Sequence, residues 1–571
     1  MLWGLLLAWR MAFGGAEVWQ IREDFSSYPE GSPAAPVWET TGIEWEVRQG
    51  EFVAAEGEKT FALLARAPQG RFVVVEATLR VEASLHREWK VAGLVLWQNA
   101  HNYWHLALVE APESLQRRHF VELVESLEGR WLAQSEAETR LTMTEGFGAD
   151  FDWHYGRPYR LRLELTPEGI RGTVRELDGT ERARLAFRFD HPRAVTFGKP
   201  GLDSGGFRAA FDDVVAQVKE VVPMGEERKG YPPFAVKGDP ARRARATGFF
   251  RVEEQQGRWW LFTPQGEAFY ILGTDHARYQ GHWCENLGYA PYHRVVQKKY
   301  GNEEAWARET LRRLKAWGFN TLTAGHSPSL RYQGLAHTEF LGLGAGFAGS
   351  YPLAPRVHWT GFPNVFHPKF PQYCEKVAQQ RCAPNKDDPW LLGYFLDNEL
   401  EWYGKPPEGH LLYWAMSKPA EDPAKQALVA FFRQRYKDIA AFNRAWGTQV
   451  ADFEALLPLT GLPRADTKEA EKDRADFLGL LAERYFAITT AAIRQHDPNH
   501  LILGCRFAGN APEAVWRAAG KYCDIVSVNI YPRVDLEREE VLGVEELLER
   551  AYSWAQRPLM VTEWSFPALD A

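Results

Sequence analysis

Residues 17–222 alternate apolar and polar side chains in short runs. Gly, Pro and Asp separate the runs, and few segments repeat apolar residues at the spacing of a helix. A period of two with such punctuation is typical of antiparallel strands packed face to face. We therefore expect an antiparallel β-sandwich (a jelly roll), with strands that include Phe72–Arg80, Val91–Trp97, Tyr103–Val109 and Tyr159–Leu165.

The pattern changes in residues 248–571, where apolar strands alternate with amphipathic helices. Apolar residues at helical spacing predict helices over Glu303–Trp317, Asp473–Gln495 and Val544–Trp554. Alternating strands and helices predict a parallel sheet, and seven or eight such units predict a (β/α)8 TIM barrel. A doubly wound sheet is the alternative, but no Gly-rich phosphate loop follows the strands. The expected strands are Ala268–Gly273, Asn320–Ala324, Glu339–Gly344, Leu391–Leu396, Leu501–Cys505, Ile525–Ile530 and Leu559–Thr562.

The seventh of these strands runs directly into Glu563, and eight residues follow that glutamate. A further helix and strand do not fit into eight residues. An unclosed barrel would leave backbone groups at two sheet edges unpaired. We therefore expect a barrel that is truncated after strand 7.

Two segments lie outside the two domains. Residues 223–247 are rich in Pro, Gly and charge, and we expect a linker there. Residues 1–16 hold an apolar run, Leu2–Trp9, followed by small residues, which is the pattern of a signal peptide and predicts a secreted or periplasmic protein. Because Arg10 interrupts the pattern, a true start at Met11 or at an upstream codon, with a cytoplasmic protein, is the alternative. No other stretch is apolar enough to span a membrane, so no membrane partner is expected.

Composition narrows the class of partner. The 571 residues include 67 Lys and Arg against 75 Asp and Glu, a formal net charge of −8, which argues against a nucleic-acid partner. The 23 Trp, 21 Tyr and 33 Phe residues offer aromatic faces on which sugar rings stack. The five cysteines form neither a disulfide framework nor a zinc pattern, and no cofactor is expected.

Two glutamates follow predicted strands. The segment WLLGYFLDNELEW ends its strand in Asp397, Asn398 and Glu399, and PLMVTEWSF ends its strand in Glu563. Taken singly, each motif also fits a helix cap or a solvated loop. Taken together, they place two carboxyl groups at the end of a barrel where such folds carry their chemistry. Cleavage of a glycosidic bond needs such a pair, one group to protonate the leaving oxygen and one to attack or stabilise the anomeric carbon.

Asn398-Glu399 after a fourth strand and Glu563 after a seventh resemble the clan A glycoside hydrolases. GYFLDNELEW, TEWSFPALD and the LGCRFAG of Leu503–Gly509 are most similar to the β-agarases of glycoside hydrolase family 50. FNRAWGT, Phe442–Thr448, also occurs in the family 42 β-galactosidases. The block WKVAGLVLWQNAHNYWHLAL resembles the concanavalin-like, carbohydrate-binding-type jelly rolls found beside such catalytic domains.

The resemblance implies a retaining glycoside hydrolase with Glu399 and Glu563 as acid/base and nucleophile. The implied substrate is a galactan or agar-type oligosaccharide cleaved at β-galactosidic linkages. A family 42-type β-galactosidase is one alternative, and a non-catalytic carbohydrate-binding protein is another.

Five other side chains at the strand ends are candidate substrate contacts. Asn398 can donate to a sugar 2-hydroxyl. Arg506 can hold the nucleophile ionised or bind a hydroxyl. Tyr531 resembles the tyrosine that clan A enzymes aim at the nucleophile. His276 and His326 can bond hydroxyls as neutral imidazoles. A turn, a salt bridge or core packing is the alternative role for each.

Aromatic residues on the predicted loops are candidate sugar platforms, with core packing as the alternative. They are Trp402, Trp564, Trp283, Trp359 and Tyr403.

A structural Ca²⁺ is considered for the sandwich, where oxygen ligands from distant segments suit calcium. Its ligands would be Asp24, Asp212 and Asp213, and ordinary β-turns are the alternative.

Overall fold

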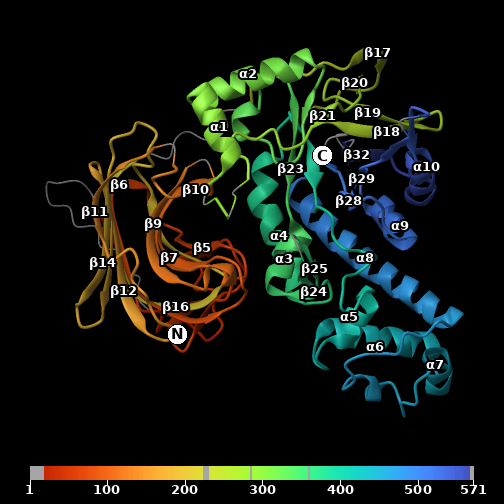
Figure 1. Ribbon diagram of the computed structural model, residues 1–571, viewed down its shortest axis with the longest axis horizontal. Coiled ribbons are helices and arrows are strands. Elements are labelled where there is room, and N and C mark those ends of the chain that lie inside the picture. The colour runs from red at the N-terminus through yellow and green to blue at the C-terminus, as the bar shows by residue number, and fades with distance from the viewer. Residues whose placement is uncertain are drawn as a thin grey trace, which may run out of the picture. The chain divides into compact units, whose positions relative to one another are not determined.

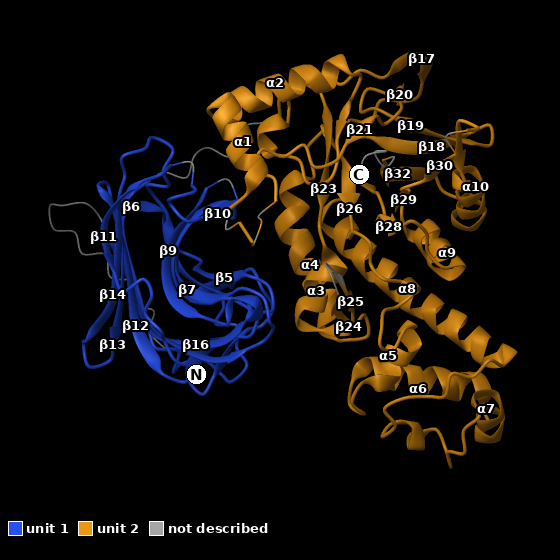
Figure 2. Cartoon of the chain, viewed as in Figure 1, with its two compact units in different colours: residues 1–229 blue, residues 230–571 orange. Residues whose placement is uncertain are grey.

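The structure of the chain is a computed structural model that describes residues 18–222 and 231–565, apart from residues 128, 138, 283, 285, 288, 358, 359 and 536. The chain divides into two compact units, Met1–Lys229 and Gly230–Ala571 (Figure 2). The expected signal peptide and residues 223–230 of the expected linker lie outside the described residues.

Unit 1 consists of two stacked antiparallel sheets (Figure 1). Within the described residues, one sheet has the order β11-β14-β13-β12-β6-β16-β4-β3 with β1 paired to β16, and the other has the order β10-β9-β8-β7-β15-β5-β2. The strands of the first sheet are β1 (Trp19–Glu23), β3 (Trp45–Arg48), β4 (Glu51–Ala54), β6 (Gly70–Ser84), β11 (Thr142–Phe147), β12 (Pro158–Thr166), β13 (Gly169–Glu176), β14 (Glu181–Arg188) and β16 (Phe207–Val221). Those of the second are β2 (Trp38–Thr40), β5 (Thr60–Leu64), β7 (Lys90–Asn99), β8 (Asn102–Glu110), β9 (His119–Leu127), β10 (Arg130–Leu132) and β15 (Lys199–Gly205).

One apolar core lies between these sheets. Every second residue of β12 is buried, as the period of two predicts, and Leu163 packs in the same cluster as Val75 of β6 and Leu106 of β8. Each such side chain contributes roughly 1.5–3 kcal/mol when it leaves water. The expected sandwich and the four strands named from the sequence are therefore present, in β6, β7, β8 and β12.

Unit 2 is organised around parallel strands in sequence order. One sheet has the order β21-β22-β23-β26-β27, another has the order β28-β29-β32, and all their pairs are parallel. The amides of Asp524 and Ile525 donate to the carbonyl of Ile502 at 3.0 and 3.2 Å, so β29 follows β27 and the two sheets continue each other. The strands are β21 (Gly273–Thr274), β22 (Thr321–Leu322), β23 (Ala336–Phe340), β26 (Leu391–Phe395), β27 (Leu501–Ile502), β28 (Phe507–Ala508), β29 (Val526–Asn529) and β32 (Leu559–Glu563).

Helices join most of these strands. α8 is the longest of the described helices, and the Thr467 hydroxyl caps it by accepting from the amide of Ala470. The helices are α1 (Pro291–Tyr300), α2 (Glu303–Ala316), α3 (Leu343–Ser350), α4 (Lys369–Arg381), α5 (Leu411–Ser417), α6 (Pro423–Tyr436), α7 (Ile439–Trp446), α8 (Lys468–His496), α9 (Glu513–Tyr522) and α10 (Val544–Ala555). The three helices named from the sequence are confirmed as α2, α8 and α10.

Antiparallel strands complete unit 2. A sheet of order β17-β20-β19-β18 precedes the parallel strands, and two hairpins, β24-β25 and β30-β31, lie in the connections. Their strands are β17 (Asp239–Arg243), β18 (Arg251–Gln255), β19 (Arg258–Phe262), β20 (Glu267–Phe269), β24 (Pro352–Val357), β25 (Thr360–Pro363), β30 (Arg533–Asp535) and β31 (Glu540–Leu542).

The structure corrects three expectations. The apolar run Ala268–Gly273 is not one parallel strand, because its start pairs antiparallel with β19 and only β21 joins the parallel run. The third strand is β23, which begins earlier than Glu339, and Leu343 already begins α3. Part of the expected linker, Asp239–Arg243, is the strand β17, which pairs with β20.

The described residues contain eight parallel strands, five in one sheet and three in the other, and no described strand pairs with both β21 and β32 to close them into a barrel. A complete eight-stranded barrel is thus not shown. Among the described residues, no helix combines the length and apolarity needed to cross a membrane.

Candidate active site

The predicted catalytic residues lie at the carboxyl ends of parallel strands. Glu399 follows β26, Arg506 follows β27, and Glu563 ends β32 in register with Asn529 of β29. The amide of Glu399 donates to the carbonyl of Arg506 at 3.1 Å, which ties two of these strand ends together.

Glu563 receives charge-assisted hydrogen bonds. Nη2 of Arg506 donates to Oε1 of Glu563 at 2.6 Å, and the hydroxyl of Tyr531 donates to Oε2. Arg506 is almost fully buried, with 3% of its side chain exposed. A buried guanidinium and a hydroxyl both favour the ionised carboxylate.

Glu399 has a different environment. The side-chain amide of Asn529 donates through Nδ2 to Oε1 of Glu399 at 3.0 Å and to Oδ1 of Asn398 at 3.1 Å. The hydroxyl of Thr562 donates to Oδ1 of Asn529 at 2.7 Å, which fixes the orientation of the amide. Because Nδ2 can only donate and the carbonyl oxygen of a carboxylic acid is the better acceptor, this contact favours Oε2 as the oxygen that carries a proton. No cation pairs with Glu399 among the described residues.

A second contact of Arg506 shows that the parallel strands of unit 2 are strongly curved. The same Nη2 atom donates to Oδ2 of Asp275 at 2.6 Å, and Asp275 follows β21, the first parallel strand. In a flat sheet the first and fifth strands would be roughly 19 Å apart, farther than an arginine side chain reaches. The parallel strands of unit 2 therefore curve until β21 and β32 both reach Arg506.

Three residues of this site have left-handed backbones. The φ angles of His276, Glu399 and Arg506 are 51°, 52° and 47°. This conformation costs a non-glycine residue about 1 kcal/mol or more, and such strain is concentrated at functional sites. His276, Glu399 and Arg506 lie in the segments that follow β21, β26 and β27.

Not every predicted contact joins this group. His326 is 8% exposed, its Nδ1 lies 2.7 Å from the carbonyl of Thr323, and Nε of Arg331 lies 2.9 Å from its Nε2. Burial lowers the pKa of His326 to about 3, so it is a neutral packing residue with both nitrogens engaged. Trp402 is 2% exposed and packs on Tyr485 and Phe486, so it has no face for a sugar.

Other aromatic candidates are exposed. Tyr531, Trp564 and Tyr403 are 59%, 63% and 54% exposed, and Trp564 directly follows Glu563. Trp283 and Trp359 lie outside the described residues.

Sequence reasoning missed Asp275, Asn529 and Thr562. Asp275 stands beside His276 in GTDH, and the other two each lie within two residues of a predicted site residue, so proximity to the strand ends was a signal. The specific contacts were not visible in the sequence, because they join strands more than 30 positions apart.

Asp275 and His276 form a hydrogen-bonded pair beside Arg506. Nδ1 of His276 lies 3.1 Å from Oδ2 of Asp275, and this hydrogen bond raises the pKa of His276. Burial by itself would raise the pKa of Asp275, but His276 and Arg506 outweigh it and lower the pKa. The hydrogen bond to Glu563 raises the pKa of Tyr531 to about 12, so its hydroxyl stays protonated as a donor.

The expected calcium ligands of unit 1 make local contacts. Asp24 accepts from Ser26, and Oδ1 of Asp212 accepts from the amide of Asp213. Across the part of the chain that the structure describes, no group of three or more His, Cys, Asp or Glu side chains is arranged to hold a metal ion.

Comparison with known proteins finds similarity to β-agarases. No family model matches the chain. It is 27% identical to β-agarase B of Vibrio sp. (strain JT0107) over 394 residues, 58% of this chain, and 26% identical to β-agarase A of the same strain over 390 residues, 57% of this chain. The chain is similar to β-agarases.

These matches cover 40% and 38% of the two relatives, so the chain spans about two fifths of their length. Among solved structures, the crystal structure of an agarase, AgWH50C, aligns with 96% of this chain and 87% of its own at a TM-score of 0.48 and 18% identity.

Asn529 offers a test of the geometry around Glu399. Replacing Asn529 by alanine removes the donor that orients both Asn398 and Glu399, and we expect kcat to fall by roughly 10²-fold with little change in KM. Thr562→Val, which frees the amide to rotate, should act in the same direction, and Thr562→Ser should restore the wild-type rate. Equal rates for Thr562→Val and wild type would contradict this role.

Asp397, which precedes Asn398 and Glu399, predicts that folding stability changes with pH. It is fully buried, and it accepts from the amides of Gly344 and Ala345 at 2.6 and 2.9 Å and from the hydroxyl of Tyr485. Burial raises its pKa to about 6. Because this folded-state pKa exceeds the unfolded value of about 3.9, its stabilising effect is complete below about pH 4 and lost as the pH rises through 6.

Denaturant unfolding of wild type and Asp397→Asn from pH 4 to 7 measures this effect. Relative to the variant, which has no titrating group there, wild type should lose about 2 kcal/mol over that interval. A difference that stays constant with pH would show that Asp397 does not titrate in this range.

Proposed function

We propose that this chain is a retaining glycoside hydrolase with Glu399 as acid/base and Glu563 as nucleophile. The observation that carries the proposal is the asymmetry of the two carboxyl groups. Glu563 accepts from a buried guanidinium and a hydroxyl, which suits an anionic nucleophile, whereas Glu399 accepts from a neutral amide that leaves Oε2 to carry a proton.

The proposed reaction has two steps. Oε2 of Glu399 gives its proton to the leaving glycosidic oxygen while Glu563 attacks the anomeric carbon, so one C–O bond breaks and a glycosyl ester forms. Glu399, now ionised, removes a proton from water, which displaces Glu563 and leaves the sugar with its original configuration. Asn398 is proposed to bond the 2-hydroxyl, Tyr531 and Arg506 hold Glu563, and His276 and Trp564 contact sugar at the edge of the site.

The proposed substrate is a galactan cleaved at β-galactosidic linkages, because the relatives of this chain are named β-agarases. We further propose that the curled parallel sheet belongs to a (β/α)8 barrel, with the sandwich as a carbohydrate-binding-type domain. The reaction needs no cofactor. A polymeric substrate would place the protein outside the cytoplasm.

A product assay tests the substrate class. Agarose, neoagaro-oligosaccharides and an aryl β-galactoside are offered side by side, with Glu563→Gln as the blank. Release of a short agar oligosaccharide, with its β-anomer formed first, is the expected result. Turnover of the aryl galactoside alone would instead support a β-galactosidase, for which the 21% identity to β-galactosidase BgaP of Planococcus sp. (strain L4) is the motivating observation.

A further inference from the structure

Unit 1 contains a cavity of about 550 Å³ that is formed by its own residues. This volume lies within the range of about 300–1,000 Å³ typical of small-molecule sites. Three segments line it, namely the end of β6 with the loop that follows, the short helix η1 (Glu113–Leu115) with Arg117 after it, and Tyr155 before β12. The lining residues are Glu82, Ala83, Ser84, Leu85, His86, Arg87, Glu113, Arg117 and Tyr155.

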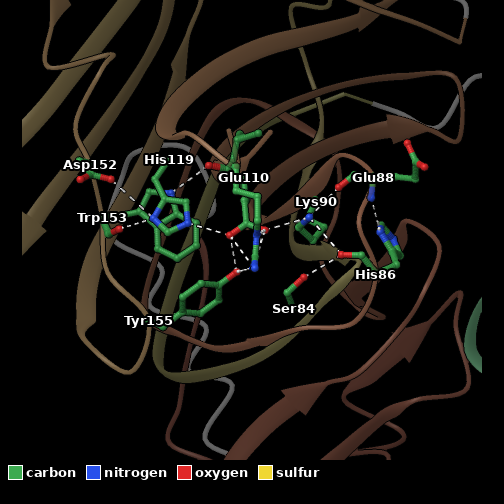
Figure 3. Close-up of polar contacts among 11 residues, drawn as sticks. Ser84, His86, Glu88, Lys90, Glu110, His119, Asp152, Trp153 and Tyr155 are labelled. Atoms are coloured by element: carbon green, nitrogen blue, oxygen red, sulfur yellow. Dashed lines mark hydrogen bonds and ion pairs between the residues drawn. The ribbon is translucent and has the colours of Figure 1, made fainter. Parts of the chain in front are cut away.

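A buried ion pair lies behind this cavity. Lys90 and Glu110 are 0% and 1% exposed, and Nζ of Lys90 lies 2.9 Å from Oε1 of Glu110. Nζ also donates to the carbonyls of His86 and Glu88 at 3.1 and 2.7 Å (Figure 3). Lys90 therefore fixes the loop that forms one wall.

Glu110 fixes the other two walls. Arg117 donates to it through Nε and Nη2 at 3.1 and 3.2 Å, and the Tyr155 hydroxyl donates to Oε2, as does His119 at 2.8 Å when Nε2 is protonated (Figure 3). Burial alone would raise the pKa of Glu110, but the hydrogen bonds from Lys90, Tyr155 and His119 lower it to about 2. Glu110 thus stays ionised and holds all of these donors.

Burying the Lys90–Glu110 pair in the sandwich has an unfavourable desolvation free energy, because two charges leave water. The backbone adds to the cost, since Gln116 and Arg117 are consecutive non-glycine residues with φ angles of 60° and 50°. The buried pair and its hydrogen bonds instead fix the geometry of the cavity. All three walls of the cavity are held in place before any ligand arrives, which lowers the entropy cost of binding.

The lining indicates the class of ligand. Arg87 and Arg117 are balanced by Glu82 and Glu113, so the cavity favours neither an anion nor a cation. Donors stand next to acceptors there, and Tyr155 adds an aromatic ring beside them. Adjacent donors and acceptors with one aromatic ring match a neutral molecule with many hydroxyl groups.

We propose that this cavity is a carbohydrate-binding site for a short, neutral sugar chain, separate from the group around Glu399 and Glu563. The site does not require the proposed reaction. It gives a location to the carbohydrate binding proposed above for the sandwich, and the choice of an agar-type sugar as the first probe also rests on the proposed function.

Calorimetric titration of the 571-residue chain tests the proposal. The Glu563→Gln background prevents consumption of the ligand, and neoagarotetraose is the probe. Leu85 lines the cavity and is 40% exposed, so Leu85→Trp fills it without disturbing the buried pair. Leu115 is 47% exposed and does not line the cavity, so Leu115→Trp is the matched control.

We expect two binding events in the background chain, one in Leu85→Trp and two in Leu115→Trp. Tyr155→Phe and Glu82→Gln should weaken the lost event by about tenfold without abolishing it. If the group around Glu399 and Glu563 does not bind this sugar, the background chain shows a single binding event, and Leu85→Trp removes it. Failure of the proposed function therefore gives a different result from failure of this proposal.

Three results would overturn the proposal. The first is sugar binding that Leu85→Trp and Leu115→Trp change equally. The second is the absence of binding by agar-, xylan- and cellulose-derived oligosaccharides alike. The third is binding of inorganic sulfate, but of no sugar, that is lost in Leu85→Trp, which would make the cavity an anion site.

Discussion

Replacing Glu563 by glutamine is expected to lower kcat by on the order of 10⁴-fold or more, because the amide cannot form the glycosyl ester. Arg506 would still donate to the amide oxygen in place of Oε1, and the amide nitrogen in place of Oε2 could donate to the hydroxyl oxygen of Tyr531, so KM and the fold should change little. Rates on the substrate found by the product assay, with circular dichroism as the fold check, measure this. Glu546→Gln, an exposed change on α10, is the matched control and should be silent.

The roles of the two glutamates are separable with azide. In Glu399→Ala, azide can attack the glycosyl ester in place of water and should restore turnover of an activated aryl glycoside, giving a product of retained configuration. In Glu563→Ala, azide takes the place of the nucleophile and should give the inverted product. An exchange of these two outcomes would reverse the assignment of the roles.

The second large effect is expected from Arg506→Met. Its guanidinium is the shared partner of Asp275 and Glu563, whose side chains are 16% and 18% exposed. Removing it leaves two partly buried carboxylates without their cation, which typically costs about 3–5 kcal/mol of folding stability. We also expect kcat/KM to fall at least about 10²-fold, since Glu563 would lose the guanidinium that holds its Oε1 in place for attack.

A second substitution separates charge from packing. Asp275→Asn in the Arg506→Met background removes one of the stranded charges and should recover part of the stability without recovering activity. Arg517→Met removes a surface pair with Glu513, in which both side chains are more than half exposed, and should cost at most about 1 kcal/mol. Equal losses for Arg506→Met and Arg517→Met in denaturant unfolding would contradict the bridging role.

Much of the fold follows from periodicity alone. The sandwich strands and the helices α2, α8 and α10 were predictable because burial on one face leaves a period in the sequence. The first and third parallel strands were misplaced, because a short apolar run does not tell a parallel strand from an antiparallel one or from the start of a helix. Strand pairing, which decides between them, depends on residues far away in the chain.

For the candidate site, the positions of most residues could be predicted from the sequence, but not the surroundings of their side chains. Glu399, Glu563, Asn398, Tyr531, Arg506 and His276 come directly after strands or at their ends, and the structure brings them together. His326 and Trp402 follow strands in the same way yet are buried. Position after a strand fixes the edge of the sheet at which a residue lies, but not whether its side chain enters the site or the core. Asn529 lies within its strand, and a polar residue inside a strand is not marked by its position as part of a site.

The most direct test of the central claim is trapping of the covalent intermediate. A 2-deoxy-2-fluoro galactoside with an activated leaving group slows both steps, so that the glycosyl ester accumulates, and peptide mass spectrometry then locates it. The account predicts an adduct on Glu563 and none in the Glu563→Gln variant. An adduct on Glu399, or a first product of inverted configuration on the natural substrate, would contradict it.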